Sequence, residues 1–294
     1  MSLKEETTLS RREAMAAMGV LAAACCAGTA RAADAVPPLK AKPSLQLYTM
    51  RDPAKQDLAG TLKKCREMGW EYVQWSGMPD MPAEKIREVL DTAGLKAVAA
   101  HCGVEAFEKD FAGQVKFWKT VGVQQVGPGG MMGDCQDSLE AWLKGAKRLD
   151  ELGAKLRGEG LSLAFHNHDK EFKKFDGDPR CKLDILYENT KPENLHCEFD
   201  LAWIFVGGAN PAEYVRKYAH RCPMVHAKDL YQKKSLTGGV QFAALGEGCL
   251  DWKDIFAAGK EAGIEYYTYE QDNSKNDIFE AAKTSFDFLK KNLA

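Results

Sequence analysis

The 294-residue sequence lacks the features that define several large classes of protein. After its N-terminal segment it has no run of about 18 to 20 apolar residues, so no later segment is predicted to span a bilayer. Net charge is also nearly absent, with 40 Lys and Arg against 42 Asp and Glu, and there is no basic stripe. We therefore expect no binding to nucleic acid.

Signatures of disulfide frameworks and of dinucleotide binding are missing as well. No C-x-x-C occurs, and the cysteines beyond the N-terminal segment are odd in number: Cys65, Cys102, Cys135, Cys181, Cys197, Cys222 and Cys249. A chain of this size needs no disulfide, so most of these thiols are predicted to be buried small apolar groups. No G-x-G-x-x-G follows the first expected strand, which removes the main argument for a dinucleotide-binding fold.

The segment 1–33 has the pattern of an export signal. Arg11-Arg12 precede an Ala- and Met-rich stretch that closes with the A-x-A pattern Ala30-Arg31-Ala32. Twin arginine before a weakly apolar core resembles a Tat signal, which directs export of folded proteins. We predict export by the Tat machinery, cleavage near Ala33, a periplasmic location and no membrane attachment after processing. An amphipathic first helix and a lipoprotein signal at Cys25 are the weaker alternatives.

The remaining chain, 34–294, is predicted to be one α/β domain, a (β/α)8 TIM barrel. The full sequence has 45% hydrophobic and 28% charged residues, which is ordinary for a globular chain. The expected strands are Ser44–Tyr48, Tyr72–Ser76, Lys96–His101, Gln124–Gly127, Leu161–His166, Leu195–Asp200, Met224–Lys228 and Tyr266–Gln271. Helical patterns lie between them, near 56–68, 83–93, 105–120, 136–158, 182–189, 211–219, 251–262 and 277–291. A doubly wound sheet is the alternative, but it more often has about five to seven strands.

Polar side chains close the last four expected strands. Barrel enzymes place their sites at the carboxyl ends of the strands, so side chains from four neighbouring strands can converge there. A single strand-end His is more often a hydrogen-bonded rim residue, and Asp200 could simply cap a turn. Their joint occurrence favours one divalent-metal site with four ligands: His166, Asp200, His226 and Glu270. Two nitrogens and two carboxylate oxygens suit Mn, Co, Zn, Fe or Ni better than Mg.

Several motifs resemble one known family. The motifs are Leu45–Asp52 (LQLYTMRD), His166–Asp169 (HNHD), Val225–Asp229 (VHAKD) and Gly246–Gly248 followed by Leu250–Trp252. In their order and spacing they resemble the sugar phosphate isomerase/epimerase family with the xylose isomerase-like barrel. The resemblance implies a metal held by residues of strands five to eight, which binds a sugar through adjacent oxygens. Asp200, His226 and Glu270 fall on ligand positions of that family.

One position departs from the family pattern. The family usually has Glu-Asn-His on strand five, and His166 stands where that glutamate would be. In the epimerases, the first and last ligand glutamates also act as paired acid and base on opposite faces of the substrate. This chain is left with Glu270 as the base, which favours isomerisation or β-elimination from a 3-keto-glycoside. His168 or Lys228 is the expected proton donor; a salt bridge is the alternative role of Lys228.

Other strand-end groups are predicted to bind substrate: His101, Gln46, Tyr48, Trp75, Trp203 and Glu247. Buried packing is the alternative for either tryptophan, and solvation for Glu247. We therefore predict a metal-dependent carbohydrate enzyme, an isomerase or epimerase that removes a proton next to a carbonyl, or a keto-glycoside lyase or hydratase. A non-catalytic sugar-binding protein and a metal-dependent endonuclease are less favoured, because Glu270 and Lys228 are intact and a basic stripe is absent.

Overall fold

The computed structural model describes residues 41–232 and 239–293. The chain divides into the units Met1–Pro37 and Pro38–Ala294, and every described residue belongs to the second unit. The predicted export signal, 1–33, lies outside the described residues. None of the described helices is both long enough and apolar enough to cross a membrane.

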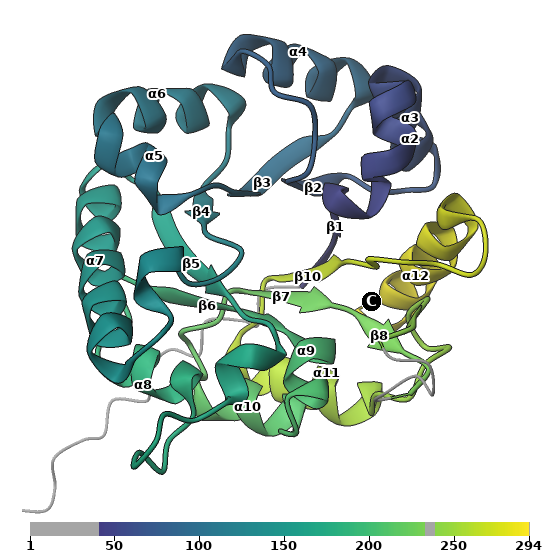
Figure 1. Ribbon diagram of the computed structural model, residues 1–294. Coiled ribbons are helices and arrows are strands. Elements are labelled where there is room, and N and C mark those ends of the chain that lie inside the picture. The colour runs from purple at the N-terminus through teal and green to yellow at the C-terminus, as the bar shows by residue number, and fades with distance from the viewer. Residues whose placement is uncertain (1–40, 233–238, 294) are drawn as a thin grey trace, which may run out of the picture. The chain divides into compact units, whose positions relative to one another are not determined.

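Eight parallel strands form a closed barrel, as predicted (Figure 1). They are β1 (Lys42–Gln46), β2 (Tyr72–Trp75), β3 (Lys96–His101), β4 (Gln125–Gly127), β5 (Ser162–His166), β6 (His196–Asp200), β7 (Met224–Ala227) and β10 (Tyr266–Tyr269). Their order around the barrel is β1-β10-β7-β6-β5-β4-β3-β2. The strands that end in the predicted metal ligands, β5, β6, β7 and β10, are therefore consecutive neighbours.

Helices surround the strands in Figure 1. They are α2 (Arg51–Gln56), α3 (Leu58–Glu67), α4 (Ala83–Ala93), α5 (Val104–Lys109), α6 (Phe111–Val121), α7 (Leu139–Gly158), α8 (Lys182–Glu188), α9 (Leu201–Val206), α10 (Pro211–Lys217), α11 (Trp252–Ala262) and α12 (Ile278–Asn292). Short 3-10 turns are η1 (Leu47–Met50), η2 (Gly133–Cys135) and η3 (Asp169–Phe172). A two-stranded antiparallel sheet, β8 (Asp229–Leu230) with β9 (Phe242–Ala243), follows β7.

The two faces of the strands differ in chemistry. Between strands and helices lies an apolar core, which includes most of the described cysteines; Cys102 and Cys249 are the more accessible ones. Inside the barrel, a small apolar group of Val98, Ala99 and Met224 packs against Tyr72 and Tyr266 near the amino ends of the strands. The inward-facing residues nearer the carboxyl ends of the strands are polar, and the candidate site lies there.

Candidate metal centre and active site

The four predicted ligands meet at the carboxyl ends of their strands. We call them the ligand cluster: His166, Asp200, His226 and Glu270. One ligand atom from each lies within 4.8 Å of the others, and all four residues are buried. The cross-strand register pairs Asp200 with His226 and places Thr268, two residues before Glu270, beside His226. The strands therefore assemble the geometry without help from a flexible loop.

Asp200 has two structural roles. Its Oδ1 accepts the backbone N–H of Trp203 at 2.9 Å and caps α9, while its own N–H donates to Asn167 Oδ1 at 3.1 Å. The other oxygen, Oδ2, lies 3.2 Å from Lys228 Nζ at the cluster. Asp200 thus caps a turn and also presents one carboxylate oxygen to the ligand cluster. Burial raises its pKa to about 6.

Lys228 is the cation of the site. Its buried Nζ lies 3.0 Å from Glu270 Oε2 and 2.9 Å from Asp272 Oδ2, in addition to the Asp200 contact. Burial disfavours the ammonium, but these three carboxylates outweigh it and raise the pKa of Lys228 above its ordinary value. The side chain is therefore a permanently charged hydrogen-bond donor beside Glu270.

The histidines of the site differ in protonation. Burial and the neighbouring imidazoles hold the pKa of His166 well below its usual value, so the ring is neutral at neutral pH and one of its nitrogens has a free lone pair. Burial also lowers the pKa of His168 to about 4. For His226, burial opposes the charge, yet the Glu270 and Glu198 carboxylates raise its pKa to about 10. Of the two predicted proton donors, Lys228 is thus the charged one at neutral pH.

Glu270 is held as a carboxylate. Burial alone would raise its pKa, but Lys228 and His226 outweigh that effect and keep the pKa well below its usual value. The His226 Nδ1 to Glu270 Oε2 distance is 2.8 Å. Its environment therefore leaves Glu270 deprotonated at neutral pH, as a metal ligand or a base requires.

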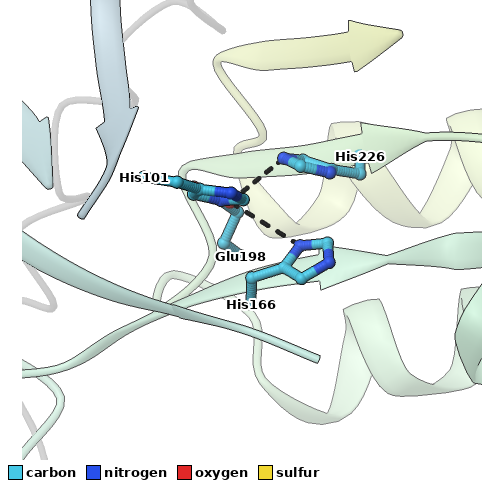
Figure 2. A group of neighbouring side chains, drawn as sticks. All are labelled: His101, His166, Glu198 and His226. Atoms are coloured by element: carbon cyan, nitrogen blue, oxygen red, sulfur yellow. Dashed lines mark hydrogen bonds and ion pairs between the residues drawn. The ribbon is translucent and has the colours of Figure 1, made fainter. Parts of the chain in front are cut away.

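A second acidic residue, Glu198, lies one pleat below Asp200 and was not predicted as a site residue. Together with His101, His166 and His226 it forms another group whose potential ligand atoms lie within 4.8 Å of one another. Figure 2 shows the three imidazoles around the Glu198 carboxylate. Alternation along β6 places residues 198 and 200 on one face, and that spacing is the sequence signal that could have found Glu198.

Trp203, a predicted substrate residue, and His168, a predicted proton donor, lie beside the ligand cluster. Trp203 and His168 have ring centroids 5.6 Å apart, and Lys228 Nζ lies 5.6 Å from the Trp203 ring. Phe242 of β9 packs edge-on against Trp203 at 5.4 Å. These aromatic rings form one side of the site beside Lys228, a position suited to stacking on a sugar face.

Trp75 and Gln46, both predicted substrate residues, lie on different faces of the barrel wall. Gln74 is the β2 residue that points into the barrel, so Trp75 faces outward and packs in the core between strand and helices. Gln46 faces inward, is 0% exposed, and both ends of its amide are bonded to the protein. Substrate binding by either side chain stays a prediction.

Tyr48, Glu247 and His101 differ in their relation to the cluster. Tyr48 lies in η1 rather than in β1, is 37% exposed, and stacks under the Arg51 guanidinium at 4.2 Å. Glu247 is exposed on the segment that follows β9. Within residues 41–232 and 239–293, neither side chain has a hydrogen bond or ion pair to the ligand cluster. His101 does reach the centre, through Glu198.

The fold and the site define a (β/α)8 barrel with a buried imidazole–carboxylate centre at the carboxyl ends of its strands. The family described as "Xylose isomerase-like TIM barrel" matches residues 62–292, and the chain belongs to this family. The predicted resemblance is confirmed at this level.

Curated relatives are inosose dehydratases. That of Lacticaseibacillus casei is 26% identical over 165 residues, which cover 51% of this chain and 54% of the relative. The inosose dehydratase of Salmonella typhimurium (strain LT2) is 29% identical over 170 residues, which cover 51% of this chain and 55% of the relative. The chain thus spans about half the length of the curated relatives it matches.

Solved structures show the same fold. A sugar phosphate isomerase/epimerase from Parabacteroides distasonis superimposes with a TM-score of 0.73 at 19% identity, covering 85% of this chain and 93% of the other. The IOLI protein with a bound zinc atom gives a TM-score of 0.64 at 18% identity, covering 86% and 98%.

Proposed function

We propose that the protein is a divalent-metal-dependent enzyme that removes a proton next to the carbonyl of a polyhydroxylated ketone and expels a β-substituent. The observation that supports this most directly is the convergence of His166, Asp200, His226 and Glu270 from four consecutive strands. Lys228 beside Glu270 adds a buried positive charge and hydrogen-bond donor to the same site.

The residues present fit a metal ion. Ligand atoms at about 2.0 to 2.2 Å from one ion lie within about 4 Å of one another, so the cluster needs shifts of less than about 1 Å. His166 Nδ1 is buried without a hydrogen-bond partner and lies 3.7 Å from Glu198 Oε1, so the protein leaves this imidazole unsatisfied, as expected for a side chain that takes an ion. The donor set favours Mn, Co, Zn, Fe or Ni over Mg. A bound ion would polarise the substrate carbonyl and stabilise negative charge on its oxygen.

Glu270 is the proposed base, and among the residues that the structure describes the ligand cluster holds no second glutamate. An imidazole, His166, stands at the position of the second glutamate of the epimerases. Asp272 comes from the same strand end as Glu270 and is bound to the same Lys228. One-base chemistry therefore favours elimination or isomerisation over inversion of a carbon. Lys228 would donate a hydrogen bond to the substrate oxygen that gains charge.

The relatives favour elimination. Inosose dehydratases, by their name, remove water from an inosose, which is a polyhydroxylated ketone. A 3-keto-glycoside has the same arrangement, with a leaving group on the carbon β to the ketone. The second candidate, a sugar isomerase or epimerase, draws on the family resemblance and on the name of the Parabacteroides protein.

Deuterium exchange tests the proposal. Metal-loaded protein would be incubated in D2O with an inosose, a 3-keto-glucoside and simple ketohexoses, and followed by NMR. We expect deuterium at the carbon next to the carbonyl together with release of the β-substituent. Glu270→Gln should abolish both, whereas Glu193→Gln, which removes an exposed carboxylate, should change neither.

The possible outcomes separate the candidates. Deuterium incorporation without loss of a substituent would indicate isomerisation or epimerisation instead of elimination. Exchange by Glu270→Gln at the wild-type rate would show that Glu270 is not the base. Absence of exchange with every ketone would contradict the proposed chemistry altogether.

A further inference from the structure

Below the ligand cluster lies a layer of hydrogen-bonded polar side chains, which we call the polar layer: Gln46, Gln74, Gln125 and Glu198. All four are buried, and four nitrogens converge on the Glu198 carboxylate, those of Gln74, Gln125, His101 and His226. His101 Nε2 lies 2.5 Å from Oε1, while the amide nitrogens of Gln74 and Gln125 each lie 3.0 Å from Oε2. The carboxylate thus remains an anion whose hydrogen bonds come from the protein.

The direction of hydrogen bonding in this layer is fixed by the backbone. The N–H of Tyr48, which can only donate, points to Gln46 Oε1 at 3.3 Å. Gln46 Nε2 must then be the end that donates to Gln74 Oε1, at 3.0 Å. Gln74 Nε2 in turn donates to Glu198. No amide in the series can be reversed without placing two donors or two acceptors face to face.

The direction of these hydrogen bonds shows that one particular ring nitrogen of His226 bears a hydrogen. Its Nε2 lies 2.7 Å from Gln74 Oε1 and 3.0 Å from Glu198 Oε1. Both atoms accept hydrogen bonds, so Nε2 must bear the hydrogen. The other ring nitrogen, Nδ1, lies 2.8 Å from the Glu270 carboxylate, to which it donates in the metal-free protein. It faces the ligand cluster, so it is the nitrogen that would give up its hydrogen to coordinate an ion there.

We propose that Glu198 is a positioning residue, which holds His226 with Nε2 protonated and Nδ1 presented to the metal. This inference rests on the metal centre of the proposed function. A carboxylate that accepts the second N–H of a metal-ligating imidazole fixes the ring orientation and strengthens the ligand. His101 buttresses the arrangement, because its ring stacks on that of His226 at 5.5 Å with 19° between the planes.

The alternative is that Glu198 itself binds an ion, in the group shown in Figure 2. The contacts argue against it. Binding there would take the Oε1 lone pairs away from His101 and His226, and would force the hydrogen from His226 Nε2 onto the nitrogen that the ligand cluster needs. The two groups share His166 and His226, so they compete for the same imidazoles.

The test measures metal binding rather than turnover. Purified wild-type protein, stripped with a chelator, would be titrated calorimetrically with Zn²⁺ in parallel with Glu198→Gln and Glu193→Gln. We expect one ion per chain in each protein and a loss of affinity of about 10- to 100-fold only in Glu198→Gln. The same affinity in all three would overturn the inference. Two ions in the wild type and one in Glu198→Gln would overturn it as well, because Glu198 would then be a ligand.

A measurement on the wild type keeps the inference testable if Glu198→Gln does not fold. With ¹⁵N-labelled imidazoles, the NMR spectrum of the Zn²⁺-loaded protein should show a protonated Nε2 and a metal-bound Nδ1 for His226. A metal-bound Nε2 would overturn it. Failure of the wild type to bind Zn²⁺, Mn²⁺ or Co²⁺ would instead contradict the proposed metal centre, and the two failures are thus distinguishable.

Discussion

At the scale of single residues, Lys228 is the side chain on which the charge balance of the site depends most. Three carboxylates, those of Asp200, Glu270 and Asp272, lie within 3.2 Å of its ammonium. Carboxylates that lose a buried cation must be protonated or find another positive charge. Lys228 and a bound divalent ion would therefore both neutralise the negative charge of these carboxylates.

We accordingly predict that Lys228→Met destabilises the metal-free protein by about 3 to 5 kcal/mol. Added Zn²⁺ should restore part of the loss, because the ion replaces the missing charge. Urea unfolding with and without metal measures both effects. Lys253→Met, on the exposed side of α11, is the control and should unfold like the wild type. An equal loss with and without metal would contradict the shared role.

The sequence predicts some site residues far better than others. His166, Asp200, His226 and Glu270 could be found because each stands out as a polar residue at the end of an apolar strand. Gln74 and Gln125 could not, because an amide inside a strand has no distinctive spacing, and a register shift between Val73 and Gln74 breaks the alternation. Strand-end position alone does not reveal which face a side chain occupies, so it could not show that Trp75 packs in the core between strand and helices.

At the scale of elements, Asp229 of β8 ties the segment after β9 to the barrel. Its carboxylate accepts the N–H groups of Gly246, Gly248 and Leu250 at 3.1 to 3.3 Å, and the indole N–H of Trp252 at 2.7 Å. Gly248 is required there, because a Cβ at that position would lie 2.1 Å from Asp229 Oδ1. The VHAKD motif therefore combines a predicted ligand, a cation and a loop anchor.

Asp229→Asn should destabilise the protein by about 1 to 3 kcal/mol, because an amide nitrogen would face donors that now have a carboxylate oxygen. Amide hydrogen exchange, followed by mass spectrometry, should accelerate over 246–250 before other regions. Glu247→Gln lies in the same segment without this contact and should leave exchange unchanged. Uniform acceleration across the barrel would argue against a local anchor.

The sequence predicts the boundaries of elements that apolar runs define. It does not predict boundaries that depend on one capping side chain. All eight strands overlap the predicted ones because each contains a buried run, but β1 ends at Gln46, two residues before the predicted end at Tyr48. The helix expected over 105–120 is instead two, because Asp110 ends α5 and its Oδ1 accepts Gly113 N–H at 3.0 Å to begin α6. The helix α9 was not predicted: six residues give too short a periodicity, and only the Asp200 cap marks it.

At the scale of the whole molecule, the described cysteines are free, and most are buried. Burial raises the pKa of Cys65 and of Cys222 to about 12, so neither forms a thiolate at neutral pH. We predict that alkylation of the native protein, mapped by mass spectrometry, labels the exposed Cys249 first, and that a reducing agent leaves Tm unchanged. Rapid labelling of Cys222 in folded protein would contradict the packing described for β7.

Metal removal should affect the stability of the entire barrel. An ion that binds only the folded chain stabilises it by about 2.7 kcal/mol when present at 100 times its Kd. Its ligands come from four strands that are distant in sequence, so the gain should appear as one cooperative shift of Tm by several degrees. Differential scanning calorimetry with chelator and with Zn²⁺ checks this. Identical transitions would count against the metal centre.

Export remains a proposal that rests on the sequence alone. Replacing both arginines of the predicted signal with lysine, Arg11→Lys with Arg12→Lys, should leave the precursor uncleaved and in the cytoplasm. Cell fractionation and the mass of the accumulated protein provide the measurement. Normal cleavage and periplasmic recovery of this variant would show that the twin arginines are not an export signal.

The polar layer also has a consequence for engineering. Most barrels of this architecture fill their interior with branched apolar side chains, whereas this one holds three amides and a carboxylate at mid-height. Replacing all four, together with the His101 and His226 imidazoles bonded to them, by well-packed apolar side chains should make the barrel more heat-resistant, since replacing a complete buried polar group with apolar packing is often neutral or stabilising. The same change would remove a member of the ligand cluster. A screen for thermostability would therefore select against this layer, and a screen for catalysis would retain it.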